Sequence, residues 1–339
     1  MKAAVIQSPG ILAVEEVPEP IIGAYDALCA TVAAAICAGT DSHIVDNDPY
    51  HQVTFPTILG HEGIGRVLSV GPKVGNLAQG MLVTRVMNKL PEGSRYSLRY
   101  GAFADKTVVT DWQAMRDDGL PEEEWRPYSM QRPLPAGIDP VAATMIITWR
   151  ETFSFFSRME PQARESILII GSGANALSFV EHARNRSLSV AVVGSPGRAS
   201  AFADAGAHVV PYSAPNVSEQ LAKSGFRTFD LVIDAVGNSA TTNAVLERLR
   251  PGGRLGVYGL NEFHSYSINP NRAQGDFSFF DGKIYDEGGA HEAVIAHLLA
   301  GELDHRRYLS ESHYYPLARI ADALAATRER KVFKSVIVW

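Results

Sequence analysis

A glycine-rich turn between a predicted strand and a predicted helix constrains the fold of this chain more than any other feature. The apolar run 166–170 leads directly into Gly171-Ser172-Gly173-Ala174-Asn175-Ala176, and a helix-like stretch follows to residue 186. In a dinucleotide-binding turn, a glycine permits the tight turn, a second lets pyrophosphate approach the backbone, and a third small residue lets the helix pack closely. The free N–H groups of such a helix face the phosphates. The sequence therefore predicts a nucleotide site that contains Gly171, Gly173, Ala174, Asn175 and Ala176.

Strand-like and helix-like segments alternate from this turn to about residue 258. The predicted strands are 166–170, 190–193, 208–211, 230–234 and 254–258, and the predicted helices are 175–186, 198–205, 217–223 and 240–249. Such alternation is typical of a parallel sheet with crossover helices. We therefore expect an α/β fold with a Rossmann-type, doubly wound nucleotide domain.

The end of the second predicted strand bears on the choice of nucleotide. An NAD site usually has an acidic residue here for the ribose 2′-hydroxyl, but the segment after residue 193 has none. Ser195 and Arg198 could instead donate hydrogen bonds to a 2′-phosphate, so NADP(H) is favoured over NAD. The alternative is that Arg198 is merely solvated and selectivity is weak. Ala235, Val236 and Gly259 are expected to border the cofactor, and Asp234 to shape that turn.

The first 110 residues have a different character. Short β-branched runs at 27–32, 65–70, 81–86 and 106–110 are separated by Gly, Pro, Asn and Asp, which indicates a β-rich region. Residues 111–133 interrupt this pattern and are interpreted as a surface insertion with a short acidic helix. The insertion is either a solvated loop or a lid or subunit contact anchored by Trp112, Trp125 and Tyr128.

Composition narrows the class of protein. The 339 residues are 46% hydrophobic and 20% charged, and the formal net charge is −6. No basic cluster suggests nucleic acid, and no segment approaches the ~18 uninterrupted apolar residues that span a bilayer. The N-terminal residues lack the pattern of a signal peptide, so we expect a cytoplasmic protein. Two cysteines, Cys29 and Cys37, are too few for a disulfide framework.

Several motifs in combination resemble the medium-chain dehydrogenase/reductase superfamily, in its alcohol, polyol and sugar dehydrogenase branch. They are Gly39-Thr40-Asp41-Ser42-His43, Gly60-His61-Glu62-Gly63-Ile64-Gly65, Val70-Gly71-Pro72-Lys73-Val74, Gly101-Ala102-Phe103-Ala104, the nucleotide turn and Pro251-Gly252-Gly253-Arg254. The resemblance implies a GroES-like β domain, at 1–147 and 288–339, interrupted by a Rossmann domain at 148–287. It also implies a small-molecule substrate and a homodimer or homotetramer, for which 254–260 and 264–280 are candidate exposed edges.

The resemblance also raises a question about zinc. In similar zinc enzymes a Cys two residues before the Thr or Ser of the first motif, a His and often a Glu of the second, and a further donor hold the catalytic metal. Here His61 and Glu62 are present, but the other two positions fall at Ala38 and Ile146, which have no donor atom. Zinc needs about three protein ligands, so a catalytic zinc is doubtful. Cys37 would serve only if the chain bulges, because neighbouring side chains point to opposite faces of an extended segment. Glu151 lies about 140° around from Ile146 on the helix predicted over 140–159. A structural zinc is not expected, since residues 88–100 contain no Cys.

The same resemblance implies which residues transfer protons to and from the substrate. Thr40 and His43 match the relay of the superfamily, and His61, oriented by Asp41, is a candidate general acid or oxyanion donor. Trp149 and Arg150 are expected to line the substrate pocket, although Arg150-Glu151 could also be an ion pair on a helix.

Three hypotheses follow. The preferred one is an NADP(H)-dependent oxidoreductase that interconverts an alcohol and a ketone or aldehyde without zinc, with reduction of an activated C=C or C=N bond as a variant. The second is a zinc-dependent polyol or sugar dehydrogenase whose ligands are His61, Glu62 and Cys37 or Glu151. The third is a catalytically silent nucleotide-binding regulatory protein.

Overall fold

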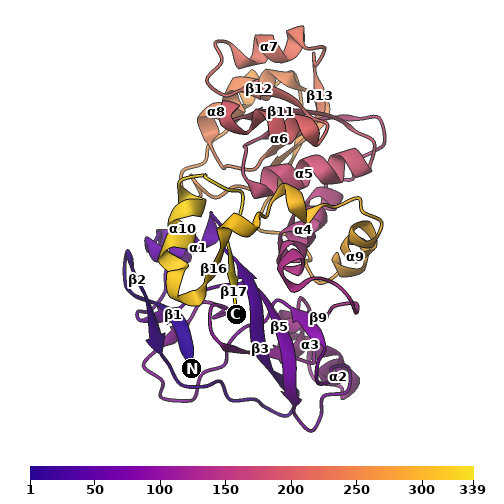
Figure 1. Ribbon diagram of the computed structural model, residues 1–339. Coiled ribbons are helices and arrows are strands. Elements are labelled where there is room, and N and C mark those ends of the chain that lie inside the picture. Colours follow the sequence, from indigo (N-terminus) through magenta and orange to yellow (C-terminus); the bar gives the residue numbers. More distant parts are fainter. The chain divides into compact units, whose positions relative to one another are not determined.

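The computed structural model describes residues 1–49 and 51–339, and the chain forms two compact units (Figure 1). The first unit comprises Met1–Ile147 and Asp304–Trp339, and the second comprises Thr148–Leu303. The chain passes from the first to the second within helix α4 (Pro140–Arg158). The sequence analysis placed the return to the first domain at residue 288, whereas helix α9 (His291–Leu299) belongs to the second unit. The physical reason is that α9 packs on α4, where the rings of Phe153 and His297 lie 5.7 Å apart.

The second unit has a six-stranded parallel sheet in the order β12-β11-β10-β13-β14-β15. The order reverses between β10 and β13, which is the switch point where open α/β sheets bind ligands. The Rossmann fold predicted from the alternating segments is therefore confirmed. The strands are β10 (Ser166–Ile170), β11 (Ser189–Gly194), β12 (His208–Pro211), β13 (Phe229–Asp234), β14 (Leu249–Val257) and β15 (Phe277–Asp281), and the helices besides α4 and α9 are α5 (Ala174–Asn185), α6 (Ala199–Asp204), α7 (Val217–Lys223) and α8 (Ser239–Val245).

One of the two candidate exposed edges is wrong. Residues 254–257 belong to β14, which is internal because β13 and β15 pair with it on either side. The other candidate, 264–280, contains most of β15, which is the edge strand. The sequence analysis missed this strand as a sheet element because its burial is only partial.

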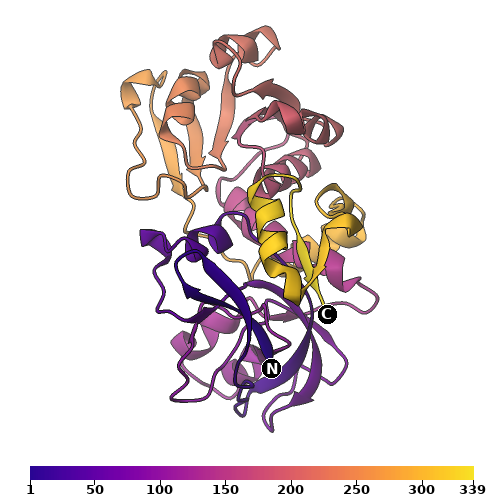
Figure 2. The same ribbon diagram turned by 60° about the vertical axis from the view of Figure 1, so that its left-hand side comes forward.

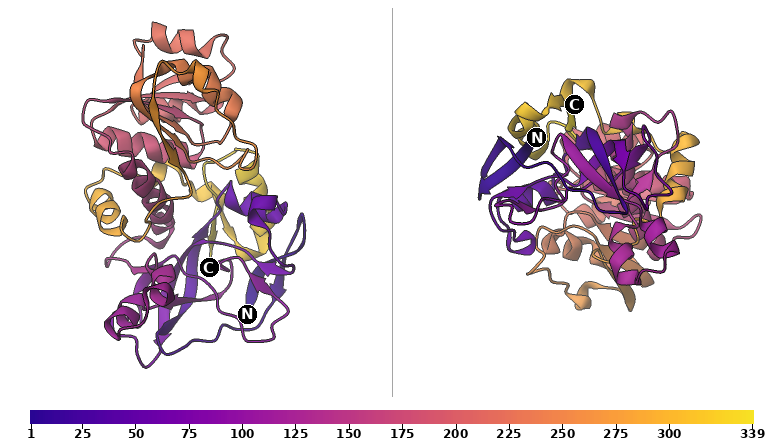
Figure 3. Two further views of the ribbon diagram at one scale, coloured as in Figure 1. Left: turned by 180° about the vertical axis from the view of Figure 1, so that it is seen from behind. Right: turned by 90° about the horizontal axis from the view of Figure 1, so that it is seen from below.

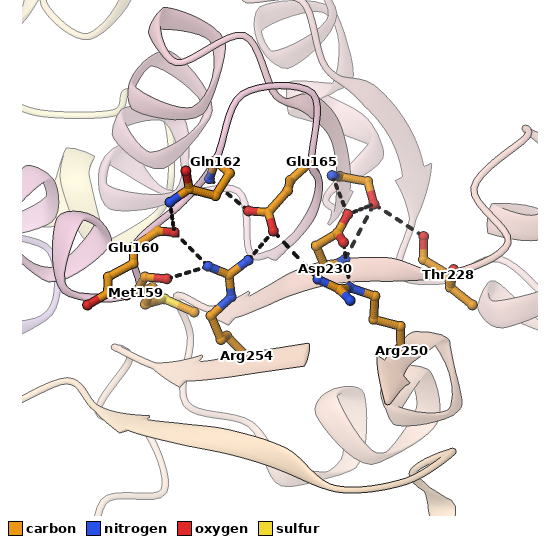
Figure 4. A network of polar contacts seen from close by, with 9 residues as sticks. Met159, Glu160, Gln162, Glu165, Thr228, Asp230, Arg250 and Arg254 are labelled. Atoms are coloured by element: carbon orange, nitrogen blue, oxygen red, sulfur yellow. Dashed lines mark hydrogen bonds and ion pairs between the residues drawn. The ribbon is translucent and has the colours of Figure 1, made fainter. Parts of the chain in front are cut away.

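A network of ion pairs joins the amino ends of three parallel strands (Figure 4). Arg254 of β14 pairs with Glu165 and donates hydrogen bonds to the carbonyl oxygens of Met159 (2.8 Å) and Glu160 (2.7 Å). Asp230 of β13 accepts hydrogen bonds from the backbone and hydroxyl of Ser166, and Arg250 Nε lies 2.5 Å from Asp230. These contacts fix the amino ends of the strands, so the opposite, carboxyl ends form the rim that is left for ligands.

The first unit is β-rich, as predicted, and contains two sheets. One has the order β2-β1-β4-β7, and the other follows β16-β17-β3-β5-β6-β9, with β8 paired to β3. The strands are β1 (Lys2–Ser8), β2 (Ile11–Glu16), β3 (Asp26–Ala35), β4 (Thr57–Ile58), β5 (Glu62–Val70), β6 (Leu82–Thr84), β7 (Ser97–Leu98), β8 (Lys106–Thr110), β9 (Arg132–Pro133), β16 (Tyr314–Pro316) and β17 (Val336–Val338). The helices are α1 (Thr40–Val45), α2 (Trp112–Asp117), α3 (Glu122–Trp125) and α10 (Ile320–Arg328).

The last segment of the chain completes the first unit (Figures 2 and 3). Strand β17 pairs antiparallel with β3, and Ile320 and Leu324 of α10 share a buried apolar core with Ile44 of α1. Burial of such side chains stabilises each by about 1.5–3 kcal/mol, so α1 is held on its apolar side by residues from the end of the chain.

Residues 111–133 form a small structured region. Asp111 caps α2 by accepting a hydrogen bond from Ala114 N, and the rings of Trp112 and Trp125 stack 5.7 Å apart. The side chain of Gln131 accepts a hydrogen bond from Thr110 N and donates one to the carbonyl oxygen of Arg85. These contacts fasten the region to the β strands of its own unit. Its predicted role as a lid or subunit contact stays a prediction.

Among the described residues, no helix is both long enough and apolar enough to cross a membrane.

Candidate active site

Three donor side chains meet in the first unit where strand β3 ends and strand β5 begins. The sulfur of Cys37, a ring nitrogen of His61 and a carboxylate oxygen of Glu62 lie within 4.8 Å of one another. The chain leaves the extended conformation after Ala35 and turns at residues 38 and 39 before α1. Because Cys37 does not lie in an extended strand, the alternation of side chains that argued against it does not apply.

Asp41 holds two of the three donors in place. Its side chain is fully buried, and one oxygen accepts a hydrogen bond from the backbone N–H of Cys37 at 2.9 Å. The other oxygen lies 3.1 Å from Nδ1 of His61. A carboxylate on one ring nitrogen fixes the tautomer and leaves the other nitrogen to bind a metal. Asp41 therefore orients the histidine and positions the cysteine at the same time.

Glu62 and His61 owe their positions to close packing. Glu62 pairs across the sheet with Ala35 and makes a buried ion pair with Lys334. Gly60, immediately before His61, has φ +103°, and a Cβ there would lie 2.6 Å from the ring of Phe103. Only glycine fits this conformation and this space. The backbone carbonyl of His61 accepts a hydrogen bond from Arg85 at 2.9 Å.

The electrostatics of His61 depend on two opposing effects. Burial disfavours the imidazolium, but the charge of Asp41 and its hydrogen bond outweigh burial and raise the pKa of His61 well above its usual value. A raised pKa is compatible with the general-acid role that the sequence analysis expected of His61, and that role stays a prediction. A metal ion would have to displace this proton, because ligating histidine is neutral.

Thr40 and His43 lie one turn apart on α1, directly after the turn that contains Cys37. Residues three apart share a helix face. The side chain of His43 is 20% exposed, and its Nδ1 lies 3.4 Å from Asp48. This exposure gives His43 a route for proton exchange with water, while Thr40 offers a hydroxyl on the same face.

The predicted nucleotide turn lies at the carboxyl end of β10, at the switch point of the sheet. Gly171 has φ +128°, and a Cβ there would lie 3.0 Å from Val236 and 3.5 Å from Ala176. At Gly173, the N-cap of α5, a Cβ would meet no atom within 4 Å. The backbone is therefore open at the position that must admit pyrophosphate. Ala174, Asn175 and Ala176 form the first turn of α5.

The ends of the neighbouring strands complete this rim. Asp234 of β13 accepts hydrogen bonds from the backbone N–H groups of Val236 and Gly237, both at 2.8 Å, so it shapes the turn that includes Ala235. Gly259, just beyond β14, packs directly against the backbone of Val236. Two predicted nucleotide-bordering segments are thus in contact.

Ser195 and Arg198 follow β11 and lie beside the glycine-rich turn. Arg198 Nη1 donates a hydrogen bond to the carbonyl oxygen of Ser172 at 2.7 Å, and the backbone N–H of Ser195 donates to the Ser172 hydroxyl at 3.1 Å. A guanidinium and a hydroxyl are therefore located at the end of the second strand, where the ribose of a dinucleotide is bound in this fold.

Comparisons with known proteins agree with this architecture. Residues 23–121 match the model of the alcohol dehydrogenase GroES-like domain, and residues 175–276 match that of the zinc-binding dehydrogenase family. The two matches together span more than half of the chain. The chain belongs to the medium-chain, zinc-type alcohol dehydrogenase superfamily. It is a NAD(P)-dependent medium-chain dehydrogenase with a GroES-like and a Rossmann domain.

Individual relatives cover nearly the whole chain. L-galactonate-5-dehydrogenase of Escherichia coli (strain K12) is 26% identical over 100% of this chain and 99% of its own length. Sorbitol dehydrogenase of Bacillus subtilis (strain 168) is 25% identical over 96% of this chain and 92% of its own. The solved structure of alcohol dehydrogenase TADH from Thermus sp. ATN1 has a TM-score of 0.80 at 23% identity, covering 100% of this chain and 99% of that one.

The residues predicted to line the substrate pocket of this dehydrogenase have partners inside the second unit. Trp149 and Arg150 are fully buried in α4. Trp149 Nε1 donates a hydrogen bond to Glu181 at 3.3 Å, while Arg150 pairs with Glu287 and lies 3.1 Å from Nδ1 of His291. Their contact with substrate stays a prediction.

Glu151, the other candidate for a rearranged zinc ligand, lies in the second unit. Its carboxylate accepts a hydrogen bond from the hydroxyl of Tyr258 at 3.5 Å. The donor cluster of the first unit contains Cys37 and not Glu151.

Sequence reasoning missed three residues that build this site. Lys334 and Arg85 lie far from the His61-Glu62 motif along the chain, and Phe103 belongs to the motif at 101–104 but has no spacing that connects it to His61. Lys334 could have been suspected, since a lysine in the otherwise apolar terminal strand region must find a carboxylate partner if it is buried.

Proposed function

We propose that this dehydrogenase is zinc-dependent and NADP(H)-linked, and that it interconverts an alcohol or polyol with the corresponding ketone or aldehyde. The observation that carries the proposal is the convergence of Cys37, His61 and Glu62 within 4.8 Å of one another. A thiolate, an imidazole and a carboxylate are ligands that zinc accepts in catalytic sites, where three protein ligands leave a position for substrate. This favours the second of the three hypotheses over the zinc-free form.

The donor set has the surroundings that a metal needs. Asp41 supplies the carboxylate behind the ligating imidazole, and such outer partners are worth 10–100-fold in metal affinity. When bound, zinc would supply a Lewis acid that polarises the carbonyl or acidifies the alcohol. The names of the relatives, a sorbitol and a galactonate dehydrogenase, support a polyol or sugar-acid substrate.

The chain's own residues then divide the remaining tasks. Thr40 accepts the hydroxyl proton of the alcohol as it gives up its own, and His43 passes a proton to water through its exposed edge. When bound, the nicotinamide would supply the acceptor for the hydride that leaves the carbon. Gly171, Gly173 and the first turn of α5 bind the pyrophosphate, and Ser195 with Arg198 binds the 2′-phosphate that distinguishes NADP(H).

Substitution of Cys37 tests the metal assignment, and substitution of Cys29 is the control. We expect protein purified without chelators to retain about one zinc per chain after buffer exchange, and Cys37→Ala to lose that zinc together with alcohol oxidation. Cys29→Ala is the matched control, because Cys29 lies in a buried apolar cluster outside the donor group, where burial raises its pKa to about 12. Mass-spectrometric metal analysis provides the readout.

Two outcomes would contradict the proposal. If the wild type retains no zinc yet reduces carbonyls with NADPH, the zinc-free form with His61 as proton donor is correct. If Cys37→Ala keeps its zinc, the ligand set is wrong.

A further inference from the structure

A second group of side chains that can bind a metal lies in the first unit. It is separate from the group of Cys37, His61 and Glu62, which we call the Cys37 set. Donor atoms of His43, Asp48 and His51 lie within 4.8 Å of one another. The rings of His43 and His51 are 5.8 Å apart between centroids, at 39°. Two imidazoles and one carboxylate are a set that divalent first-row metals accept.

Backbone hydrogen bonds fix the spacing of these three residues. Asp48 N donates to the carbonyl oxygen of His43 at 2.8 Å, and His51 N donates to that of Asp48 at 2.9 Å. Arg328 of α10 pairs with Asp46 at 3.1 Å and donates to the carbonyl oxygen of Ser42 at 2.9 Å. The segment that carries the three donors is therefore held by main-chain contacts and does not have to fold around a metal.

The three side chains differ in exposure, with His51 buried at the base of the group and His43 and Asp48 at its solvent-facing mouth. His51 is 4% exposed, whereas the side chains of His43 and Asp48 are 20% and 33% exposed. The base of the group is thus a buried imidazole, and the mouth is open to ions from solvent.

We propose that His43, Asp48 and His51 form a second, inhibitory site for a zinc-class divalent cation. A cation bound to His43 occupies the ring nitrogen that the proton relay would use, so turnover stops while the ion stays bound. This consequence, unlike the binding itself, rests on the role of His43 in the proposed function. The positive charge of Arg99 near His51 opposes a cation, so this site fills at higher metal concentration than the Cys37 set.

Metal stoichiometry tests the site without reference to catalysis. Wild-type protein, Asp48→Asn and His51→Gln are equilibrated with excess Zn²⁺ by dialysis, and bound zinc per chain is measured. We expect each variant to bind one zinc fewer than the wild type. Asp322→Asn, which makes the same change on an exposed carboxylate outside this segment, should bind as the wild type does.

Inhibition provides the second readout. Added Zn²⁺ should inhibit the wild type, and the inhibitory concentration should rise roughly tenfold or more in Asp48→Asn and His51→Gln, each compared with its own activity before zinc is added. Circular dichroism and thermal unfolding establish that both variants fold.

Variants of the two proposed zinc sites should lose different zinc ions, so the two proposals can be tested separately. Cys37→Ala should lose the tightly held zinc but keep the zinc that Asp48→Asn loses, so failure of the proposed function would not be mistaken for failure of this site. Equal stoichiometry in the wild type, Asp48→Asn and His51→Gln would overturn the proposal, as would equal inhibitory concentrations.

Discussion

Asp41 is the residue on which the geometry of the Cys37 set most depends. The sequence analysis expected it to orient His61, but not to bind the backbone of Cys37 as well. That second contact could not be predicted, because it exists only where the chain leaves β3 and turns. Side chains alternate between the two faces of a strand, but this alternation ends where the chain leaves the strand and turns. The motif therefore predicted the position of His61 and its carboxylate partner, but it offered Cys37 as a third donor only on the condition that the chain bulges.

Arg198 provides a prediction about the nucleotide. Arg198→Gln should raise the KM for NADPH roughly 10–100-fold, since a hydrogen bond between charged groups is worth about 1.5–3 kcal/mol. The KM for NADH should change little, because NADH has no 2′-phosphate. Steady-state kinetics with both nucleotides measures the difference. Arg227→Gln, an exposed arginine of the same unit, is the control, and equal losses for both nucleotides would refute the assignment.

At the scale of elements, the sequence predicted the buried strand β10 accurately but missed β15, which is only partly buried. Strand β10 has the bounds expected of it, 166–170, because an uninterrupted apolar run bounded by glycine leaves few alternatives. Helix α9 belongs to the second unit, whereas the sequence analysis assigned residues 288–339 to the first domain. Periodicity indicates which face of a helix is buried but not which partner covers that face.

The pairing of α4 with the segment before α9 leads to a stability prediction. Arg150→Met removes the buried ion pair with Glu287 and should lower the free energy of unfolding by about 3–5 kcal/mol, because a buried charge loses its partner. Urea unfolding measures this loss. The double variant Arg150→Met/Glu287→Leu should recover part of it. A raised substrate KM with unchanged stability would instead support the predicted pocket role of Arg150.

Helix α5 should be sensitive to acid through His182. Burial lowers the pKa of His182 to about 3, so the folded unit binds its proton only far below the usual 6.5. The free energy of unfolding therefore decreases as the pH falls from about 6.5 toward 3, by nearly 1.4 kcal/mol per pH unit. Hydrogen exchange of α5 peptides at pH 7, 6 and 5 should show this loss in the wild type and less in His182→Gln. An equal pH dependence in both would contradict the prediction, with His264→Gln as the control.

At the scale of the whole molecule, the resemblance predicted two domains of which the first is discontinuous. The α/β class followed from the alternating segments, and the GroES-like domain followed from the motifs; both are confirmed. The pairing of β17 with β3 could not be predicted from the last few residues alone, because pairing over such a separation depends on the folded sheet.

Nucleotide binding should stabilise the second unit by mass action. At NADPH concentrations about 100 times Kd, the free energy of opening should rise by about 2.7 kcal/mol. Hydrogen exchange should detect this protection in peptides of 148–303. Gly173→Ala should fold normally, since its Cβ would meet no atom within 4 Å, but should lose the protection because the methyl group occupies the path of the pyrophosphate. Equal protection in the variant would show that NADPH binds elsewhere.

The buried ion pair between Glu62 and Lys334 sets an order of events during biosynthesis. The ribosome synthesises Cys37, His61 and Glu62 early, whereas Lys334, two residues before β17, follows only after the whole nucleotide unit. The nucleotide unit can therefore fold on the nascent chain while the donor cluster still lacks its final partner. In the proposed zinc site, a metal ion that arrived before Lys334 is synthesised would meet a pocket without this partner, so we expect zinc loading to follow the synthesis of Lys334.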